Sequence, residues 1–357
     1  MRFLAIVGTL IVALGAYTGL WFWTAHRLET GIEQWAAAER EKGAIVDYQA
    51  LEITGFPYRM RAELTEPAVA RPTEGGMAMW ATPMLVIDSY PYKINHLIFD
   101  FPAPIFYDRP LGDKPHNKNW REQTEFRFEE AHASVVLTLS GARASFEAKG
   151  ITARARFAED GQEPEPFAPL LTADTVNAHL RPAPGRDNVY EGYADAAALT
   201  VLRANPRTKQ LPPPVSRFEA QFYVTEAQSV TQALLDGADP AALLKGWAGQ
   251  GGELEIERFY VNVKGTELTA SGALAVDEDG YAQGPLKFKA VGWQKSDVLI
   301  NPGGTLPADK QEMAKGIYEL FDQLDGKLDG TMQTELLLMR GGAWLGPFRL
   351  ITVGKVW

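Results

Sequence analysis

The chain has 357 residues, no cysteine and a formal net charge of −10. Without cysteine it can form no disulfide, and thiol catalysis, iron–sulfur clusters and cysteine zinc sites are excluded. The acidic balance offers no electrostatic footprint for nucleic acid, so we expect no nucleic-acid partner. Hydrophobic residues make up 46% of the chain, which is ordinary for a folded protein and argues against disorder.

The segment from Phe3 to Trp23 contains no charged residue. As a helix rising about 1.5 Å per residue it would span roughly 31 Å, which matches a bilayer core. A cleavable signal has an apolar region of only about 7–15 residues, and the small residues Ala13, Gly15 and Ala16 lie inside this longer run. We therefore predict a retained single-pass anchor. The flanking Lys and Arg counts are similar, so the orientation is predicted from the layout: a short tail and a large C-terminal body favour a bacterial inner-membrane protein with its body in the periplasm.

The helix is predicted to continue beyond the membrane. Leu28, Ile32 and Trp35 recur at helical spacing, and Gly43 is a natural stop because glycine tolerates the left-handed cap conformation. We predict one helix over residues 3–42, so that residues 1–43 form the anchor with its juxtamembrane extension.

After Gly43 the spacing of apolar residues changes from helical to alternating. Such alternation is typical of antiparallel strands with one face buried and one face in water. It is found at residues 58–64, 97–101, 135–139, 151–157, 218–224, 268–276, 286–290 and 348–350. Three helices are predicted at 225–235, 239–247 and 306–326. The fold class is therefore mainly β: an elongated, curved antiparallel sheet, an open β-sandwich or a half-barrel, with a few flanking helices.

Proline-rich segments are the best candidates for a boundary between lobes, because proline cannot donate to a β-ladder. Residues 205–214 include three consecutive prolines at 212–214. We predict this segment as a linker between a first β-rich lobe, 44–204, and a second lobe with helices, 215–357.

The segment Gly55-Phe56-Pro57-Tyr58-Arg59 stands out locally. Gly55 permits unusual backbone angles and Pro57 forces Phe56 to be extended, so a sheet corner with Phe56 aimed inward is expected. A functional interpretation makes it the mouth of a binding groove, with Arg59 facing an anionic ligand. The aromatic-rich stretch from Trp80 to Trp120 is either core under a long loop or the wall of such a groove. The candidate groove residues are Phe56, Tyr58, Arg59, Trp80, Phe99 and Phe101.

No catalytic motif is found. The five histidines include no pair with the four-residue spacing of a helical zinc site, and neither a nucleophile elbow nor a phosphate-binding loop is present. One acidic segment, Asp277-Glu278-Asp279-Gly280, resembles part of a calcium-binding loop. Because it lies between two alternating segments, it is predicted to be a hairpin turn. We predict a protein that is not an enzyme and needs neither metal nor cofactor.

The chain resembles an uncharacterised bacterial family, domain of unknown function 2125. The resemblance rests on the N-terminal span, on the Gly55-Phe56-Pro57-Tyr58-Arg59 segment and on Leu345-Gly346-Pro347 before the last strand. The family implies no activity, and it is similar in general look to membrane-anchored periplasmic β-groove proteins, including the AsmA-like lipid-transport group. We expect a protein that binds or handles lipid or another apolar ligand at the cell envelope. The alternative is an assembly or adaptor protein that binds other envelope proteins.

Overall fold

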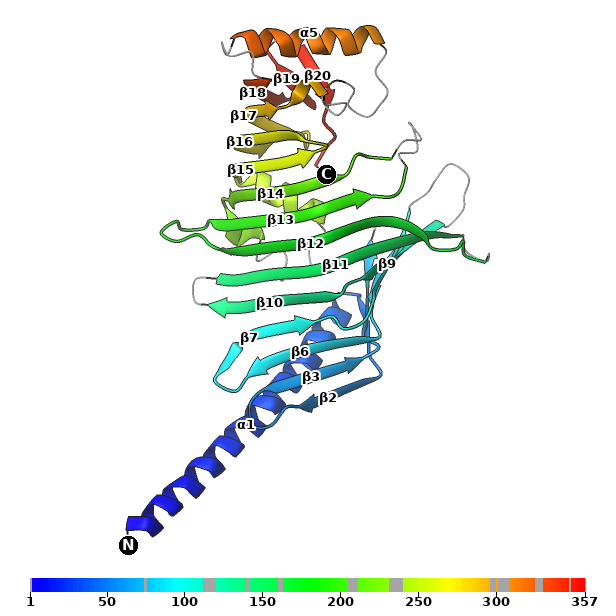
Figure 1. The fold of residues 1–357 in the computed structure, drawn as a ribbon. Coiled ribbons are helices and arrows are strands. Elements are labelled where there is room, and N and C mark those ends of the chain that lie inside the picture. Colours follow the sequence, from blue (N-terminus) through cyan, green and yellow to red (C-terminus); the bar gives the residue numbers. More distant parts are fainter. Residues whose placement is uncertain are drawn as a thin grey trace. The chain divides into compact units, whose positions relative to one another are not determined.

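The computed structural model describes residues 2–73, 76–111, 120–138, 141–159, 163–204, 211–230, 240–295, 300, 308–324, 330–346 and 348–356. These residues are mainly β-strand with few helices, which confirms the predicted fold class (Figure 1). The chain forms two compact units. Unit 1 comprises Met1–Phe146 and Ala153–Ala168, and unit 2 comprises Glu147–Thr152 and Pro169–Trp357.

The N-terminal helix α1 runs unbroken over Arg2–Glu41, which confirms the predicted helix. It is long and apolar enough to cross a membrane. Gly43 ends it in the left-handed conformation, with φ of +86°. The backbone N–H of Ala44 donates to the carbonyl of Glu39 at 3.0 Å and that of Gly43 to Arg40, as expected where a glycine terminates a helix.

Unit 1 contains two antiparallel strand series. The first consists of β2 (Ala50–Thr54), β3 (Met60–Thr65), β6 (Met84–Tyr90), β7 (Lys93–Asp100) and β10 (Glu130–Thr138), paired in that order. Alternation along β3 buries Met60, Ala62 and Leu64 on one face. We call this the inner face of the first series. Strands predicted around residues 58–64, 97–101 and 135–139 are therefore confirmed.

The second series of unit 1 consists of β1 (Ile45–Asp47), β4 (Ala68–Thr73), β5 (Gly76–Ala81), β8 (Ile105–Pro110) and β9 (Trp120–Arg127). The long strand β11 (Gly141–Glu159) pairs with β9. It includes the strand predicted at 151–157.

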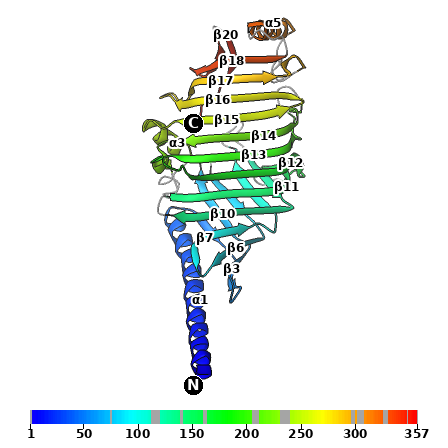
Figure 2. The same cartoon turned by 60° about the vertical axis from the view of Figure 1, so that its left-hand side comes forward.

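The C-terminal half of α1 forms part of the core of unit 1. Trp21 packs with Ala25 and Met60 against the first series, and Leu28 and Ile32 join the cluster around Ala62 and Ile87. Nearer the end of the helix, Ala36 packs against Ala44 and against Val46 and Val69 of the second series. The N-terminal half projects beyond the strands of unit 1 (Figure 2). One helix thus combines an exposed apolar segment with a buried core segment.

Unit 2 is an antiparallel meander in which each strand pairs with the next one along the chain. Its strands are β12 (Ala168–Pro182), β13 (Tyr190–Val201), β14 (Val215–Val224), β15 (Leu254–Val263), β16 (Thr266–Val276), β17 (Ala282–Val291), β18 (Thr331–Met339), β19 (Gly342–Leu345) and β20 (Phe348–Thr352). The strands predicted at 218–224, 268–276, 286–290 and 348–350 are confirmed.

The helices of unit 2 are α3 (Pro240–Gly249), the short 3-10 helix η1 (Trp293–Lys295) and α5 (Ala308–Leu324). The helices predicted at 239–247 and 306–326 are confirmed within two residues at each end, while most of the one predicted at 225–235 lies outside the described residues. Residues 277–280 form a hairpin turn, as predicted, with the N–H of Gly280 donating to the Asp277 carbonyl at 3.0 Å. Most of the predicted linker 205–214, and Pro347, also lie outside the described residues. The flanking strands β13 and β14 pair directly in unit 2.

Candidate functional site

The sheet of unit 2 has one strongly apolar face. The register places the side chains of neighbouring strands opposite one another on it: Ala196 opposite Phe218, Ala220 opposite Phe259, and Ala270 opposite Phe288. We define the apolar face as Val176, Ala178, Ala194, Ala196, Phe218, Ala220, Phe222, Ile256, Phe259, Val261, Leu268, Ala270, Leu286 and Phe288. It therefore extends without interruption over six strands, β12 to β17.

The opposite face of the same sheet is polar. Asn177 donates to Asp195 at 2.9 Å, Arg217 and Arg258 both contact Glu219, and Lys287 lies opposite Glu335. Burial raises the pKa of Tyr193 on this face, and the nearby charges of Asp195 and Glu219 raise it further. The contrast between the two faces follows from the period-2 alternation of each strand.

The apolar face is buried to different degrees along its length: helices cover it at one end, and its centre is only partly buried. Ala290 of β17, Met332 of β18 and Leu345 of β19 pack with Trp293 of η1 and Tyr318 of α5, and each is at most 5% exposed. Burial there raises the pKa of the Tyr318 hydroxyl. On β14 and β15 the large apolar residues are only partly buried, namely Phe218, Phe222, Ile256, Phe259 and Val261. The centre of the face thus keeps apolar surface accessible that the α5 end has buried.

Small residues alternate with these large ones across the face. Gly192 lies under the ring of Phe222, and a Cβ at this position would come within 2.3 Å of the Phe222 Cζ atom. Gly272 on β16 would bring a Cβ within 2.3 Å of the Pro285 carbonyl oxygen. Glycine is therefore required for the close approach of ring and strand at these two positions.

The predicted groove residues Phe56, Tyr58 and Arg59 lie together, in the turn that joins β2 to β3. The N–H of Arg59 donates to the Gly55 carbonyl at 3.1 Å, and Gly55 has φ of +96°. The Phe56–Pro57 peptide bond is cis. The predicted sheet corner is present, but Phe56 does not point into the core: it is 48% exposed and its ring packs against Trp21 and Phe22 of α1.

The other predicted groove residues lie elsewhere in unit 1. Phe99 packs in the cluster on the inner face of the first series, beside Ile87. Phe101 follows β7, and its N–H donates to the Ala131 carbonyl at 3.1 Å. Trp80 is on β5 in the second series, where its ring stacks on Tyr107. The structure thus gathers three of the six residues at one turn and distributes the rest, and residues 112–119 of the aromatic stretch lie outside its described part.

A family model described as an uncharacterized protein conserved in bacteria (DUF2125) matches residues 21–353. The chain belongs to this family. The resemblance stated from the sequence is confirmed. The match begins at Trp21, the residue at which α1 enters the core of unit 1. No curated protein and no solved structure matches the chain, so the likeness to the AsmA-like group stays a prediction.

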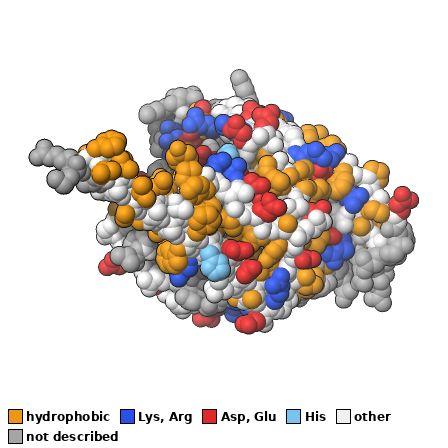
Figure 3. Space-filling model, turned by 90° about the horizontal axis from the view of Figure 1, so that it is seen from below, with side chains coloured by type: hydrophobic (Ala, Val, Ile, Leu, Met, Phe, Trp, Pro, Cys, Tyr) orange, Lys and Arg blue, Asp and Glu red, His pale blue; other side chains and the backbone are white. Residues whose placement is uncertain are grey.

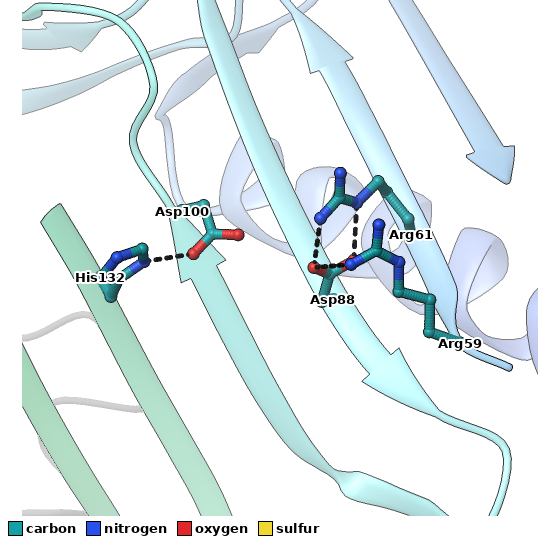
Figure 4. A network of polar contacts seen from close by, with 5 residues as sticks. All are labelled: Arg59, Arg61, Asp88, Asp100 and His132. Carbon is teal, nitrogen blue, oxygen red and sulfur yellow. Dashed lines mark hydrogen bonds and ion pairs between the residues drawn. The ribbon is translucent and has the colours of Figure 1, made fainter. Parts of the chain in front are cut away.

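A polar network lies on the outer face of the first series of this DUF2125 chain (Figure 4). Asp88 accepts two hydrogen bonds from Arg61, at 2.9 and 2.6 Å, and Arg59 lies 3.5 Å from the same carboxylate. The hydrogen bond to Asp88 raises the pKa of Arg61 further above its ordinary value. Nearby, His132 Nδ1 lies 2.5 Å from Asp100, and His96 contacts Ser134.

The arrangement of these groups is that of ion pairs which satisfy one another. The Asp88 carboxylate pairs with both Arg59 and Arg61. The Arg59 guanidinium is therefore directed along the sheet toward Asp88. Among the residues that the structure describes, no three His, Asp or Glu side chains lie close enough to hold a metal ion.

Sequence reasoning missed the part of the apolar face contributed by β12, β13 and β15. On β15 a bulge between Ile256 and Phe259 shifts the register, so these two residues share a face although they are three positions apart. Simple alternation therefore fails over Leu254–Val263. On β12 and β13 the apolar positions are mostly alanine, and a weak hydrophobic contrast hides the alternation.

Proposed function

We propose that this DUF2125 protein is anchored in the inner membrane by α1, with its body in the periplasm, and that the apolar face of unit 2 binds acyl chains of lipids. The observation that carries the proposal is the partial burial of Phe218, Phe222, Ile256, Phe259 and Val261 on a continuous apolar face. Apolar side chains stabilise a fold most when they are fully buried, so partial burial leaves apolar surface available to a ligand. An acyl chain bound on this face would gain about 0.8 kcal/mol of binding free energy for each methylene that it buries.

The membrane part of the proposal is supported by the two halves of α1. Most residues from Phe3 to Gly19 are apolar, and most of their large side chains are exposed, including Leu4, Leu10 and Leu14. Large apolar side chains that stay in water are unfavourable, whereas the same side chains in a bilayer are not. The helix continues without a break into the core of unit 1, so the anchor and the body form one structural element.

Acyl chains are favoured over a protein partner by the chemistry of the face. Its centre is built of Phe, Val, Ile and Ala, and neither a charged residue nor a hydrogen-bond donor from a side chain is among its members. Protein interfaces combine an apolar centre with Arg and Tyr anchors and a polar rim. A surface without such groups suits a ligand that has no polar group along its length.

The proposal is tested by crosslinking in the membrane. Full-length protein is reconstituted in vesicles that contain a phospholipid with a photoactivatable diazirine in one acyl chain, and the crosslinked peptides are mapped. Crosslinks in residues 3–23 report the anchor alone. We expect a second set on β14, β15 and β16, at residues of the apolar face. Crosslinks confined to α1 and to the surface of unit 1 beside the membrane would reject acyl-chain binding and would favour the adaptor alternative.

A further inference from the structure

We propose that the Gly55–Arg59 turn, together with the tip between β6 and β7, is a membrane-docking surface that sits in the headgroup region of the bilayer spanned by α1. This inference rests on the anchoring part of the proposed function and is independent of acyl-chain binding by unit 2. It assigns the partner of the surface as the lipid–water interface itself.

Specific contacts hold the turn at a defined height along the axis of α1. The Tyr17 hydroxyl donates to the Pro57 carbonyl at 2.5 Å, and Trp21 Nε1 donates to the Arg59 carbonyl at 3.0 Å. The ring of Phe56 lies 5.4 Å from Trp21 and 6.0 Å from Phe22, measured between centroids. Two hydrogen bonds and two ring contacts therefore hold the turn beside residues 17–22 of the helix.

That height coincides with the edge of the bilayer. From Phe3 to Trp21 the helix rises about 27 Å, at about 1.5 Å per residue, and a bilayer core is about 30 Å thick. A helix whose first apolar residues lie at the inner boundary thus reaches the outer boundary near Trp21. Whatever is fixed beside residues 17–22 is carried to the same depth, and a tilt of the helix brings it deeper.

The turn presents rings to its surroundings at this depth. Tyr58 is 81% exposed, and Phe22 and Trp23 are exposed on the adjacent helix surface. The neighbouring tip contributes Tyr92, which is 71% exposed and stacks on Tyr90. The two tips are adjacent because Met60, directly after the turn, pairs with Ser89. Figure 3 views the protein from the side on which α1 begins, and hydrophobic side chains gather there beside the helix.

Basic groups accompany these rings. The Arg27 guanidinium lies 5.4 Å from the centre of the Trp23 ring. Arg59, which follows Tyr58, pairs with Asp88 but keeps 46% of its side chain exposed, and Lys93 follows Tyr92. Tyr and Trp concentrate at membrane interfaces because their rings are apolar and their tips are polar, and Lys and Arg near the surface are attracted to anionic lipid. The combination matches a lipid headgroup layer better than water.

The turn is built to hold its rings outward. Gly55 has φ of +96°, and a Cβ there would lie 2.7 Å from the Arg59 carbonyl oxygen, so glycine is required to close the turn. At 81% exposure the Tyr58 ring is open to contact with the lipid interface, which favours tyrosine.

The test uses the absence of cysteine, which allows a single nitroxide label at each chosen position. Tyr58→Cys and the control Ile45→Cys are made in the full-length protein and labelled. Ile45 is also exposed, at 61%, but lies past the far end of α1. The proteins are reconstituted in phosphatidylethanolamine–phosphatidylglycerol vesicles, and the accessibility of each label to oxygen and to a water-soluble nickel chelate is measured by electron paramagnetic resonance.

We expect the label at Tyr58 to show several-fold lower accessibility to nickel than the label at Ile45, with the oxygen-to-nickel ratio of the headgroup region. Equal accessibility at the two sites would overturn the proposal. Tyr92→Cys repeats the measurement without altering the turn, in case the change at Tyr58 disturbs folding. A label at Leu10→Cys separates the docking surface from the anchor. If the label at position 10 is in lipid while those at positions 58 and 92 are in water, only the docking surface is rejected. If the label at position 10 is in water, the anchor is rejected.

Discussion

Among the residues of unit 1 that the structure describes, Glu125 is the most deeply buried carboxylate, at 3% exposed. Burial by itself would raise its pKa, but hydrogen bonds from Arg154 and Arg127 outweigh burial and hold the pKa below the ordinary value of 4.5. Arg154 Nε donates at 3.1 Å and Arg127 Nε at 2.7 Å. Glu39 at the end of α1 is held in a similar way by Lys42 and Arg71, and its pKa is also lowered. Both acids link segments that are distant in sequence.

The buried Glu125 carboxylate predicts a dependence of stability on pH. Because its pKa is lower in the folded than in the unfolded protein, its contribution is fully present above about pH 4.5 and is lost as the pH falls through the folded pKa. Glu125→Gln should lower the free energy of unfolding by about 1–3 kcal/mol at pH 7, because the amide has no charge and keeps only one of the two oxygens that accept from Arg127 and Arg154. The loss should shrink in acid. Thermal unfolding at pH 7 and at pH 3 measures the loss of stability at each pH, and the exposed Glu129→Gln is the control. An equal loss at the two pH values would contradict a lowered pKa for Glu125.

At the residue scale, the sequence predicted the sheet corner at Gly55 correctly but did not predict the environment of the Phe56 ring. The glycine and the proline determine the local backbone, and these constraints act within five residues. The partner of Phe56 is α1, more than thirty residues earlier in the chain. Local constraints therefore predicted that the chain turns here and could not show which side of the turn is covered.

At the scale of elements, α1 has two parts whose tryptophans differ in environment. Trp21 is 4% exposed and packs with Ala25 and Met60, whereas Trp23 is 54% exposed. The helical period brings them to different sides of one helix. Sequence pattern predicted the helix from its apolar run and its stop at Gly43. It did not separate the exposed from the core-facing tryptophan, because both are apolar in the same run.

The two tryptophans predict opposite results for a matched pair of substitutions. Trp21→Ala should lower the free energy of unfolding by about 3–5 kcal/mol, because it leaves a cavity and removes the hydrogen bond to Arg59. Trp23→Ala should change it by less than about 1 kcal/mol. Chemical denaturation in detergent, followed by circular dichroism, compares the variants with the parent protein. Similar losses for both would show that α1 does not enter the core as described.

The strands illustrate how far alternation can be followed. Where an apolar residue recurs at every second position, as in Leu286, Phe288 and Ala290, the strand and its buried face were predicted and are confirmed. Where a bulge interrupts the strand, as between Ile256 and Phe259, alternation failed. Sequence could not reveal how fully a face is covered, since an open face and a closed core have the same pattern.

At the scale of the whole molecule, the proposed orientation predicts which side of the membrane the body occupies. Ile45→Cys adds one exposed thiol to a chain that otherwise has none. In cells with a permeabilised outer membrane and an intact inner membrane, a membrane-impermeant maleimide should label it without lysis. Leu4→Cys, at the other end of the span, is the control and should be labelled only after lysis. The reverse pattern would place the body in the cytoplasm.

The central proposal is that unit 2 binds acyl chains on its apolar face, and one pair of variants tests it most directly. Ala270 lies on that face between Phe259 and Phe288, and the next residue, Ser271, lies on the opposite face across from Lys287. Full-length protein carrying either Ala270→Glu or Ser271→Glu is released from membranes and examined by native mass spectrometry, with thermal unfolding as a check of folding.

The account predicts that the parent protein and Ser271→Glu retain bound phospholipid while a folded Ala270→Glu loses it, because a carboxylate cannot be buried against an acyl chain without a large desolvation cost. Equal lipid retention by the two glutamate variants, or a parent protein that carries no lipid, would contradict it.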